Sequence, residues 1–357
     1  MHYKNPFKPG KMKYPEILKK YLKKYLGALF FYGGLFHILR FINNITGKRI
    51  TIVSYHRITG RQVDEIESSL PFLFTYQRTF KSHLKFMRKW YRIMTFEDLS
   101  THIQNKDIPW DSLIITFDDG YEDNYSQAYP VLKELDIPAT FFIVSGRIGA
   151  VEFKPFWWDR AYYYFRKLKE MKSGGATLSL GGEMASLFEE FEGNPSLLFK
   201  KLNEWESGKI ENLLDEFGKQ NDMPAEDLIS CNRMLTWDAV LEMRGHAEFG
   251  SHTCSHGNLL EMGREKQLEE INASKKKIEQ KVEKRVTAFS YPAGNTNEQL
   301  KALVREAGYS FAVTAERDIN RPEDRYALKR INIWEGTVLS LKGGFSKGYL
   351  ACKLLGF

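Results

Sequence analysis

The chain alternates between two kinds of apolar pattern over much of its length. Short runs rich in β-branched and aromatic residues predict buried strands. They occur at residues 49–57, 113–117, 138–144, 247–250 and 286–294. Residues 79–91 place apolar side chains at helical spacing, and residues 123–136 continue the alternation as a further helix. Because strands and helices follow each other in this way, we predict an α/β fold built on a parallel barrel.

The alternation stops between residues 150 and 233. This stretch is rich in aromatic and charged residues in a helical pattern, and glycine pairs interrupt it. We predict an inserted helical subdomain that serves as a lid or as a wall of the substrate site. The predicted divisions are an N-terminal segment at 1–48, the first barrel part at 49–149, the insertion at 150–233, the second barrel part at 234–335 and a C-terminal tail at 336–357.

The N-terminal segment combines positive charge with apolar residues. Residues 1–25 contain eight lysines among Tyr, Phe and Leu, and residues 26–42 are apolar apart from His37 and Arg40. This run is short for a spanning helix, and no small-residue cleavage site of the secretory type follows it. The pattern is typical of an amphipathic helix on an anionic membrane surface, or of a structural helix packed on the barrel. We therefore expect a cytoplasmic protein that is peripheral on the inner face of the membrane.

Overall composition excludes two other classes of protein. The net charge of +7 over 357 residues is modest and lies mostly in the N-terminal segment, so a nucleic-acid partner is not indicated. The three cysteines are odd in number and form no CxxC pattern, which argues against a disulfide framework. We expect Cys254 to be a small packing residue.

Two adjacent carboxylates follow the strand at residues 113–117. Asp118 and Asp119 precede Gly120, and the carboxyl ends of strands in α/β folds are where catalytic groups collect. Successive side chains of an extended backbone point in opposite directions, so the two acids are free to take different roles. The alternative is a solvated Asp-Asp-Gly turn without any chemistry.

Two histidines stand four residues apart later in the chain. On a helical turn this spacing would bring the rings of His252 and His256 to one face. Together with Asp119 they would form a set of two imidazoles and one carboxylate, which leaves coordination positions of a divalent ion open. The alternative is a pair of ordinary polar residues.

The two motifs together resemble a known family. Residues 116–120, followed by His252-Thr253-x-x-His256, are similar to the first two motifs of the polysaccharide deacetylase superfamily, carbohydrate esterase family four. The resemblance runs from about residue 50 to about residue 334 with one insertion. It implies a distorted (β/α) barrel and metal-dependent removal of N-acetyl, or sometimes O-acetyl, groups from sugars. The expected metal is zinc, with cobalt, nickel, manganese or iron as alternatives.

The resemblance also suggests roles for residues outside these motifs. Many members carry a late Leu-x-His motif that supplies the general acid, but this chain has no histidine after His256. A circularly permuted subgroup takes the equivalent histidine from a Tyr-His strand near the N-terminus, which would be His56. In the third motif Ser290 stands where the family has arginine, so Arg330 is the candidate for orienting the base. The alternatives are a structural histidine and a surface arginine.

The remaining candidates concern the base, the oxyanion and the sugar. We expect Asp118 to act as general base, and the turn at residues 291–293 to supply an oxyanion donor. The substrate and oxyanion candidates are Tyr291, Pro292, Ala293, Trp157 and Trp158. The two tryptophans either stack on a sugar ring or form a hydrophobic hinge in the core.

These expectations combine into a predicted activity. The chain would remove N-acetyl groups from a polysaccharide, an oligosaccharide or a lipid-linked amino sugar and release acetate. One alternative is a catalytically inactive glycan-binding protein on the same fold. The other is an amidase acting on a substrate that is not a carbohydrate.

Overall fold

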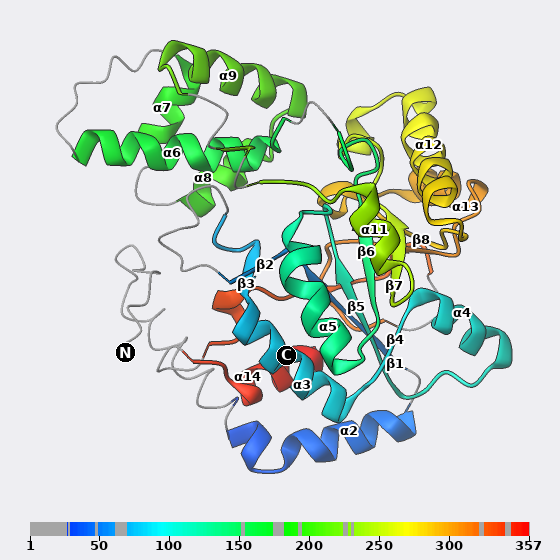
Figure 1. The fold of residues 1–357 in the computed structure, drawn as a ribbon. Coiled ribbons are helices and arrows are strands. Elements are labelled where there is room, and N and C mark those ends of the chain that lie inside the picture. Colours follow the sequence, from blue (N-terminus) through cyan, green and yellow to red (C-terminus); the bar gives the residue numbers. More distant parts are fainter. Residues whose placement is uncertain are drawn as a thin grey trace.

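A curved parallel sheet surrounded by helices forms the main body, and a separate group of helices lies at one end of it (Figure 1). The computed structural model describes residues 27, 29–46, 49–60, 70–150, 154–173, 182–191, 195–223, 228–229, 232–320, 325–339 and 344–356. All the statements below concern these residues. The lysine-rich residues 1–26 lie outside them.

The central sheet has eight strands, all paired in parallel, in the order β10-β1-β5-β6-β7-β8-β9, with β4 beside β5. The strands are β1 (Arg49–Tyr55), β4 (Arg92–Met94), β5 (Asp111–Phe117), β6 (Ala139–Ile143), β7 (Ala247–Ser251), β8 (Ala288–Ser290), β9 (Phe311–Val313) and β10 (Ile331–Asn332). A parallel bridge from Val313 to Leu328, just before β10, connects the last strand back toward the first. The predicted α/β class with a distorted barrel is therefore confirmed.

Side chains alternate between the inside and the outside of this barrel, as the period of two in a strand requires. Ile50 and Ile52 of β1 pack with Ile114 of β5 in an inner cluster. Val53 and Tyr55 of β1 pack instead in the larger cluster beneath the surrounding helices. This parity decides which residues at the strand ends face the interior.

Helices cover the outer face of the sheet. They are α3 (Gln77–Trp90), α5 (Tyr129–Leu135) after a π turn η2 (Asn124–Ala128), α11 (Trp237–Met243), α12 (Arg264–Val282), α13 (Glu298–Glu306) and α14 (Lys347–Leu354). A further helix, α4 (Phe96–Asn105), instead packs Phe96 and Leu99 in the inner cluster. A capping box between Thr95 and Asp98 starts α4. Helix α3 begins two residues earlier than predicted, so Thr79 lies inside it and donates to Glu335 Oε1 at 3.0 Å.

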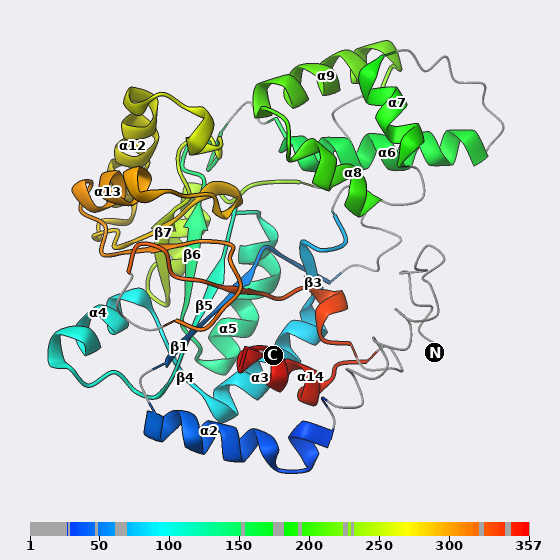
Figure 2. The ribbon, with the colours of Figure 1, turned by 180° about the vertical axis from the view of Figure 1, so that it is seen from behind.

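Four helices between β6 and β7 form a second hydrophobic core beyond the end of the barrel (Figure 2). They are α6 (Trp157–Ser173), α7 (Glu183–Glu190), α8 (Pro195–Leu202) and α9 (Ser207–Gln220). A small two-stranded sheet of β2 (Arg57–Thr59) and β3 (Phe74–Tyr76) follows β1. Because β6 ends just before this insertion, the four helices stand at the carboxyl ends of the barrel strands.

Helix α2 (Leu35–Thr46) lies at the other end of the barrel, away from the insertion in both views (Figures 1 and 2). Its Phe36 is fully buried and contacts Phe86 and Trp90 of α3. Among the described helices, none combines the length and the apolar character needed to cross a bilayer.

Candidate active site

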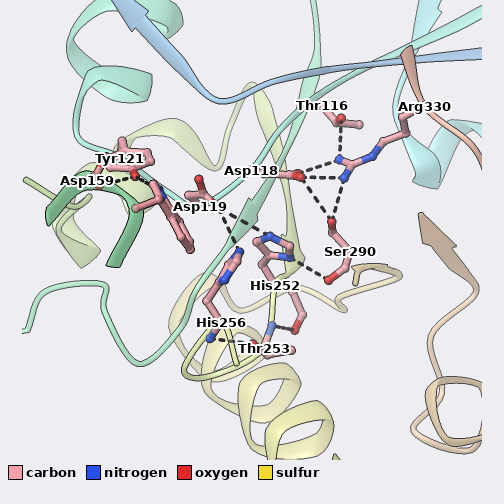
Figure 3. A network of polar contacts seen from close by, with 12 residues as sticks. Thr116, Asp118, Asp119, Tyr121, Asp159, His252, Thr253, His256, Ser290 and Arg330 are labelled. Carbon is pink, nitrogen blue, oxygen red and sulfur yellow. Dashed lines mark hydrogen bonds and ion pairs between the residues drawn. The ribbon is translucent and has the colours of Figure 1, made fainter. Parts of the chain in front are cut away.

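The two carboxylates at the end of β5 diverge as the sequence predicts, but for a different reason. Asp118 continues the inward parity of Ile114 and Thr116, and it is 3% exposed. Asp119 has φ of 75°, in the left-handed region, and Gly120 follows with φ of 83°. A left-handed residue turns the chain sharply, so the Asp119 side chain, 2% exposed, points toward a different group of residues (Figure 3).

Asp118 forms a buried ion pair with Arg330. The guanidinium donates from Nη1 to Oδ1 and from Nη2 to Oδ2, both at 2.7 Å. Its Nε–H donates to the Thr314 carbonyl at 2.9 Å, and Ser290 Oγ accepts from Nη2 at 3.1 Å. Burial alone would raise the pKa of Asp118, but the adjacent Arg330 charge holds that pKa well below its usual range. Arg330 is 4% exposed, which excludes the alternative of an ordinary surface arginine.

Asp119 faces the two histidines (Figure 3). Its Oδ1 lies 3.6 Å from His252 Nε2 and 3.4 Å from His256 Nε2. One ligand atom from each of the three residues falls within 4.8 Å of the others. His252 Nδ1 lies 2.8 Å from the Ser290 carbonyl, an acceptor only, so Nδ1 carries the proton and Nε2, on the side of the ring near Asp119, is left unprotonated.

The helical turn predicted for the histidine pair is wrong. Strand β7 ends at Ser251, and the residues after it form a loop in which Thr253 and His256 both have φ of 67°. For a β-branched residue such as Thr253 this conformation is strained, and it is stabilised by hydrogen bonds. The Thr253 carbonyl accepts from Ser145 N at 3.0 Å and from Ser274 Oγ at 3.1 Å. Two left-handed turns therefore bring the rings together.

Glu270 of α12 holds the same loop. Its Oε2 accepts the backbone N–H of Cys254 at 2.8 Å and of Ser255 at 2.9 Å. Glu270 is 3% exposed, so its carboxylate is not one of the solvated charges on the surface of this helix.

A cavity of about 500 Å³ opens above these groups. His56 follows β1 and lies in its wall together with Asp118, Asp119, His252, His256 and Arg330. A second part of the wall comes from the helical insertion. It contains Trp157 and Trp158, which were predicted, and also Phe199, Trp205 and Ile210, which were not. No local pattern distinguishes these last three from ordinary core residues of a helix.

The turn after β8 contributes main chain to the cavity. Ala293 has φ of 54°, its side chain is exposed, and none of the hydrogen bonds of the described residues uses its N–H. Pro292 lines the cavity beside it. Tyr291 has the outward parity of Phe289, and its hydroxyl donates to the Tyr326 carbonyl at 3.1 Å. Its side chain is fully buried, although Tyr291 is one of the residues that line the cavity.

The first helix of the insertion, α6, contacts one of the two histidines that face Asp119. The Trp158 ring lies 4.8 Å from the His256 ring, centroid to centroid, and its Nε1–H donates to the Tyr121 hydroxyl at 3.0 Å. That hydroxyl donates in turn to Asp159 Oδ2 at 2.7 Å. Asp159 Oδ1 has no hydrogen-bond partner among the described residues. Burial raises the pKa of Asp159 to about 7, although the charge of Arg57 and the Tyr121 hydrogen bond lower it.

We expect Asp159 to make the protein less stable as pH rises. Between its unfolded pKa of about 4 and its folded pKa of about 7, the folded state binds a proton that the unfolded state has lost. The free energy of unfolding therefore falls through this window and levels off above it, by roughly 2–4 kcal/mol in total. Asp159→Asn removes this contribution, so urea unfolding from pH 4 to 8 should show a shallower decline than the parent protein.

The control for this measurement is Glu216→Gln, which removes an exposed carboxylate of α9. It should leave the pH dependence of stability as in the parent. An equally steep decline in Asp159→Asn would mean that Asp159 is ionised throughout this range.

The chain matches the model of a known protein family. The matching family model is described as polysaccharide deacetylase, and it aligns with residues 105–179 and 212–312. The unmatched residues between the two segments fall within the helical insertion, where they include α7 and α8.

Individual relatives with similar sequences or structures carry the name of deacetylases. The Bacillus subtilis protein YxkH, which carries the name of a polysaccharide deacetylase, is 23% identical over 83% of this chain and 76% of its own length. The poly-β-1,6-N-acetyl-D-glucosamine N-deacetylase of Staphylococcus aureus is 35% identical over 78 residues, only 22% of this chain and 27% of that protein. The structure of the Streptococcus pyogenes deacetylase PplD in complex with acetate has a TM-score of 0.56 at 19% identity, covering 87% of this chain and 99% of that chain. At this identity the structural likeness shows the fold.

Proposed function

We propose that this chain, a carbohydrate deacetylase of the polysaccharide deacetylase family, hydrolyses N-acetyl groups of a glycan with the help of a divalent ion. The observation that carries this proposal is the convergence of Asp119, His252 and His256 beside the ion-paired Asp118, at the base of a cavity large enough for sugar rings.

The three residues suit a divalent ion chemically. Two neutral imidazoles and one carboxylate are the donor set of many catalytic zinc sites, and such a set leaves positions open. The hydrogen bond from His252 Nδ1 to Ser290 keeps the ligating nitrogen unprotonated. Zinc is our first candidate, with cobalt, nickel, manganese and iron as others. When bound, such an ion polarises the acetyl carbonyl and acidifies the attacking water, which allows even a weakly basic carboxylate to take the proton.

Asp118 is the proposed general base. The two hydrogen bonds from Arg330 keep it ionised and fix both of its oxygens. They also reduce its basicity, because they lower its pKa. Arg330 itself cannot take up a proton, so in this role it is a positioning residue.

The other two groups act on the carbonyl oxygen and on the leaving nitrogen. The Ala293 N–H, which projects from the left-handed turn after β8, is the proposed donor to the oxygen of the tetrahedral intermediate. His56, on the cavity wall, is the proposed acid that protonates the departing amine. The products are acetate and a free amino sugar.

The aromatic wall supports a glycan substrate rather than a small amide. Trp157 stacks on Phe199 with ring centroids 6.0 Å apart, and Trp205 lies in the same wall. Aromatic faces of this kind pack well against the apolar faces of pyranose rings. A wall of several rings suits an oligosaccharide or polymer of N-acetylated amino sugars, the class that the Staphylococcus aureus relative is named for.

Acetate release from defined substrates tests the proposal. The full chain loaded with zinc would be incubated with chitooligosaccharides, β-1,6-linked N-acetylglucosamine oligomers, peptidoglycan fragments and a lipid-linked N-acetylated sugar. We expect release from at least one of these glycans and none from a simple acetanilide. Release from the anilide alone would favour the amidase, and binding of a glycan without any release would favour an inactive binding protein.

Glu270 offers a separate prediction about metal affinity. Glu270→Ala leaves the backbone N–H groups of Cys254 and Ser255 without their acceptor, so the loop should lose its conformation and metal affinity should fall about 10–100-fold. Glu270→Gln keeps one acceptor oxygen, so its metal affinity should lie between that of the parent and that of Glu270→Ala. Competition with a chromogenic chelator measures the affinity, and Glu269→Ala, an exposed neighbour, is the control. Equal affinity in Glu270→Ala and Glu269→Ala would contradict the assigned role.

A further inference from the structure

Exposed apolar side chains concentrate at one end of the molecule. Among the described residues, ten large apolar side chains are exposed, and six of them belong to helix α2 and the residues just before it. These six, which we call the α2 face, are Leu29, Tyr32, Leu35, Ile38, Phe41 and Ile42. Apolar side chains gathered in this way mark an interaction surface more often than a solvated one.

The α2 face points outward because the other side of the helix packs on the barrel. Phe36 is fully buried, with its ring centroid 5.6 Å from that of Trp90 and 6.1 Å from that of Phe86. Arg40 lies over the Trp90 and Trp110 rings, at 5.3 and 4.9 Å from their centroids. The six side chains of the α2 face are therefore exposed while the helix itself is packed on the barrel.

Positive charge accompanies this apolar face. The first fifty residues contain eleven lysines and arginines and a single acidic residue, whereas the other 307 contain 41 basic and 44 acidic residues. Residues 27–46 contain no Asp or Glu at all. In the described part of the chain, Arg88, Lys89 and Arg92 are exposed next to Trp90, on which α2 packs.

We propose that the α2 face binds the surface of an anionic lipid bilayer, with its apolar side chains at the boundary between headgroups and acyl chains. A helix with one apolar face and basic surroundings lies in the plane of such an interface. Each nearby lysine or arginine adds attraction to anionic lipids. A second copy of this chain is a weaker fit, because two such ends would bring like charges together.

This attachment gives the catalytic cavity a definite orientation. Helix α2 leads into Arg49 at the start of β1, and His56 in the cavity wall follows the far end of that strand. Seven residues of strand span about 23 Å, so the cavity opens at the end of the barrel that faces away from the bilayer. Both views show α2 and the insertion at opposite ends (Figures 1 and 2). If the proposed deacetylase function holds, this orientation suits a glycan that extends away from the membrane.

Sedimentation with vesicles tests the attachment. The full chain would be mixed with two kinds of vesicle. One consists of phosphatidylcholine alone, and in the other about one lipid in three is the anionic phosphatidylglycerol. We expect clear binding to the anionic vesicles, weaker binding at high salt and little binding to phosphatidylcholine. Absence of binding to either vesicle would overturn the proposal.

Paired variants separate the α2 face from apolar surface in general. Ile38→Gln with Phe41→Gln removes two side chains that are 55% and 64% exposed. We expect at least a tenfold lower partition coefficient on anionic vesicles, because each loses apolar area that the lipid would bury. The control is Leu197→Gln with Leu241→Gln, at 48% and 37% exposure on other helices, which should bind as the parent does. Equal loss in both pairs, or in neither, would contradict the proposal.

Two further measurements complete the test without depending on activity. Hydrogen exchange on vesicles should slow in peptides covering 27–46 and stay unchanged in peptides covering 154–223, and the reverse pattern would place the insertion on the membrane. Sedimentation velocity without lipid should give the same mass for the parent and the Ile38→Gln, Phe41→Gln pair. A dimer that this pair abolishes would show that a second copy occupies the face.

Discussion

Asp118→Asn should lower deacetylase turnover by about 10²–10⁴-fold while the protein keeps its divalent ion. The amide side chain has nearly the same shape and its oxygen still accepts one hydrogen bond from Arg330, but it cannot take a proton from water. The metal-ligand set is a different one, formed by Asp119, His252 and His256, so the metal content should stay the same. Turnover by acetate release and metal by elemental analysis, on the same preparation, check both parts.

The fold of this variant needs its own measurement. Asp118→Asn leaves the Arg330 charge buried without a counter-ion, which costs roughly 3–5 kcal/mol of stability when a buried pair is broken. Thermal unfolding would show whether the variant is folded at the assay temperature. Asp136→Asn is the matched control, because Asp136 is exposed and sits in the left-handed C-cap of α5, where asparagine is well tolerated. Turnover near the parent value in Asp118→Asn would remove this residue from the mechanism.

The second large effect concerns the divalent ion. Dialysis against a chelator should reduce turnover by about 10³-fold or more, since a catalytic ion supplies several kcal/mol of transition-state stabilisation. Return of zinc, cobalt, nickel, manganese or iron in turn should restore activity to different degrees and identify the preferred ion. The chelated protein should remain folded, because its barrel core does not depend on the three ligands.

The His256→Ala variant connects this effect to the site. His256 Nε2 is 3.4 Å from Asp119 Oδ1, so its loss removes one of three proposed ligands. We expect weak metal binding and turnover near that of the chelated parent. His102→Ala, a histidine on α4 outside the cavity, should behave as the parent. Full activity after chelation, or in His256→Ala, would contradict a metal-dependent mechanism.

Local patterns in the chain were sufficient to predict the barrel and much of its interior. Strand periodicity puts Asp118 on the same face as Ile114, and Arg330 on the same face as Leu328, which is an inner residue. The β5 motif and the histidine pair also follow from short stretches of sequence, because each lies at a strand end. These features depend on neighbours within a few residues, which is the range over which sequence patterns act.

Other features needed the folded chain. The histidine rings meet through two left-handed residues, a conformation that Ser145, Ser274 and Glu270 stabilise from other elements. The aromatic wall of the cavity depends on how the insertion packs against the barrel, and Phe199 and Trp205 resemble core residues in isolation. Likewise, the run at residues 26–42 left a buried helix and a membrane-surface helix equally open. Only the packing of Phe36 on α3 decided which side of α2 remains exposed.

The local sequence by itself therefore determined the strand parity, the helix periodicity, the Asp118-Asp119 motif and the motif of the two histidines. The meeting of Asp118 with Arg330, 212 residues later, and of Asp119 with two loop histidines was decided by tertiary structure. The physical reason is that burial, charge pairing and left-handed backbone are stabilised by partners distant in the chain, whose positions no local pattern contains.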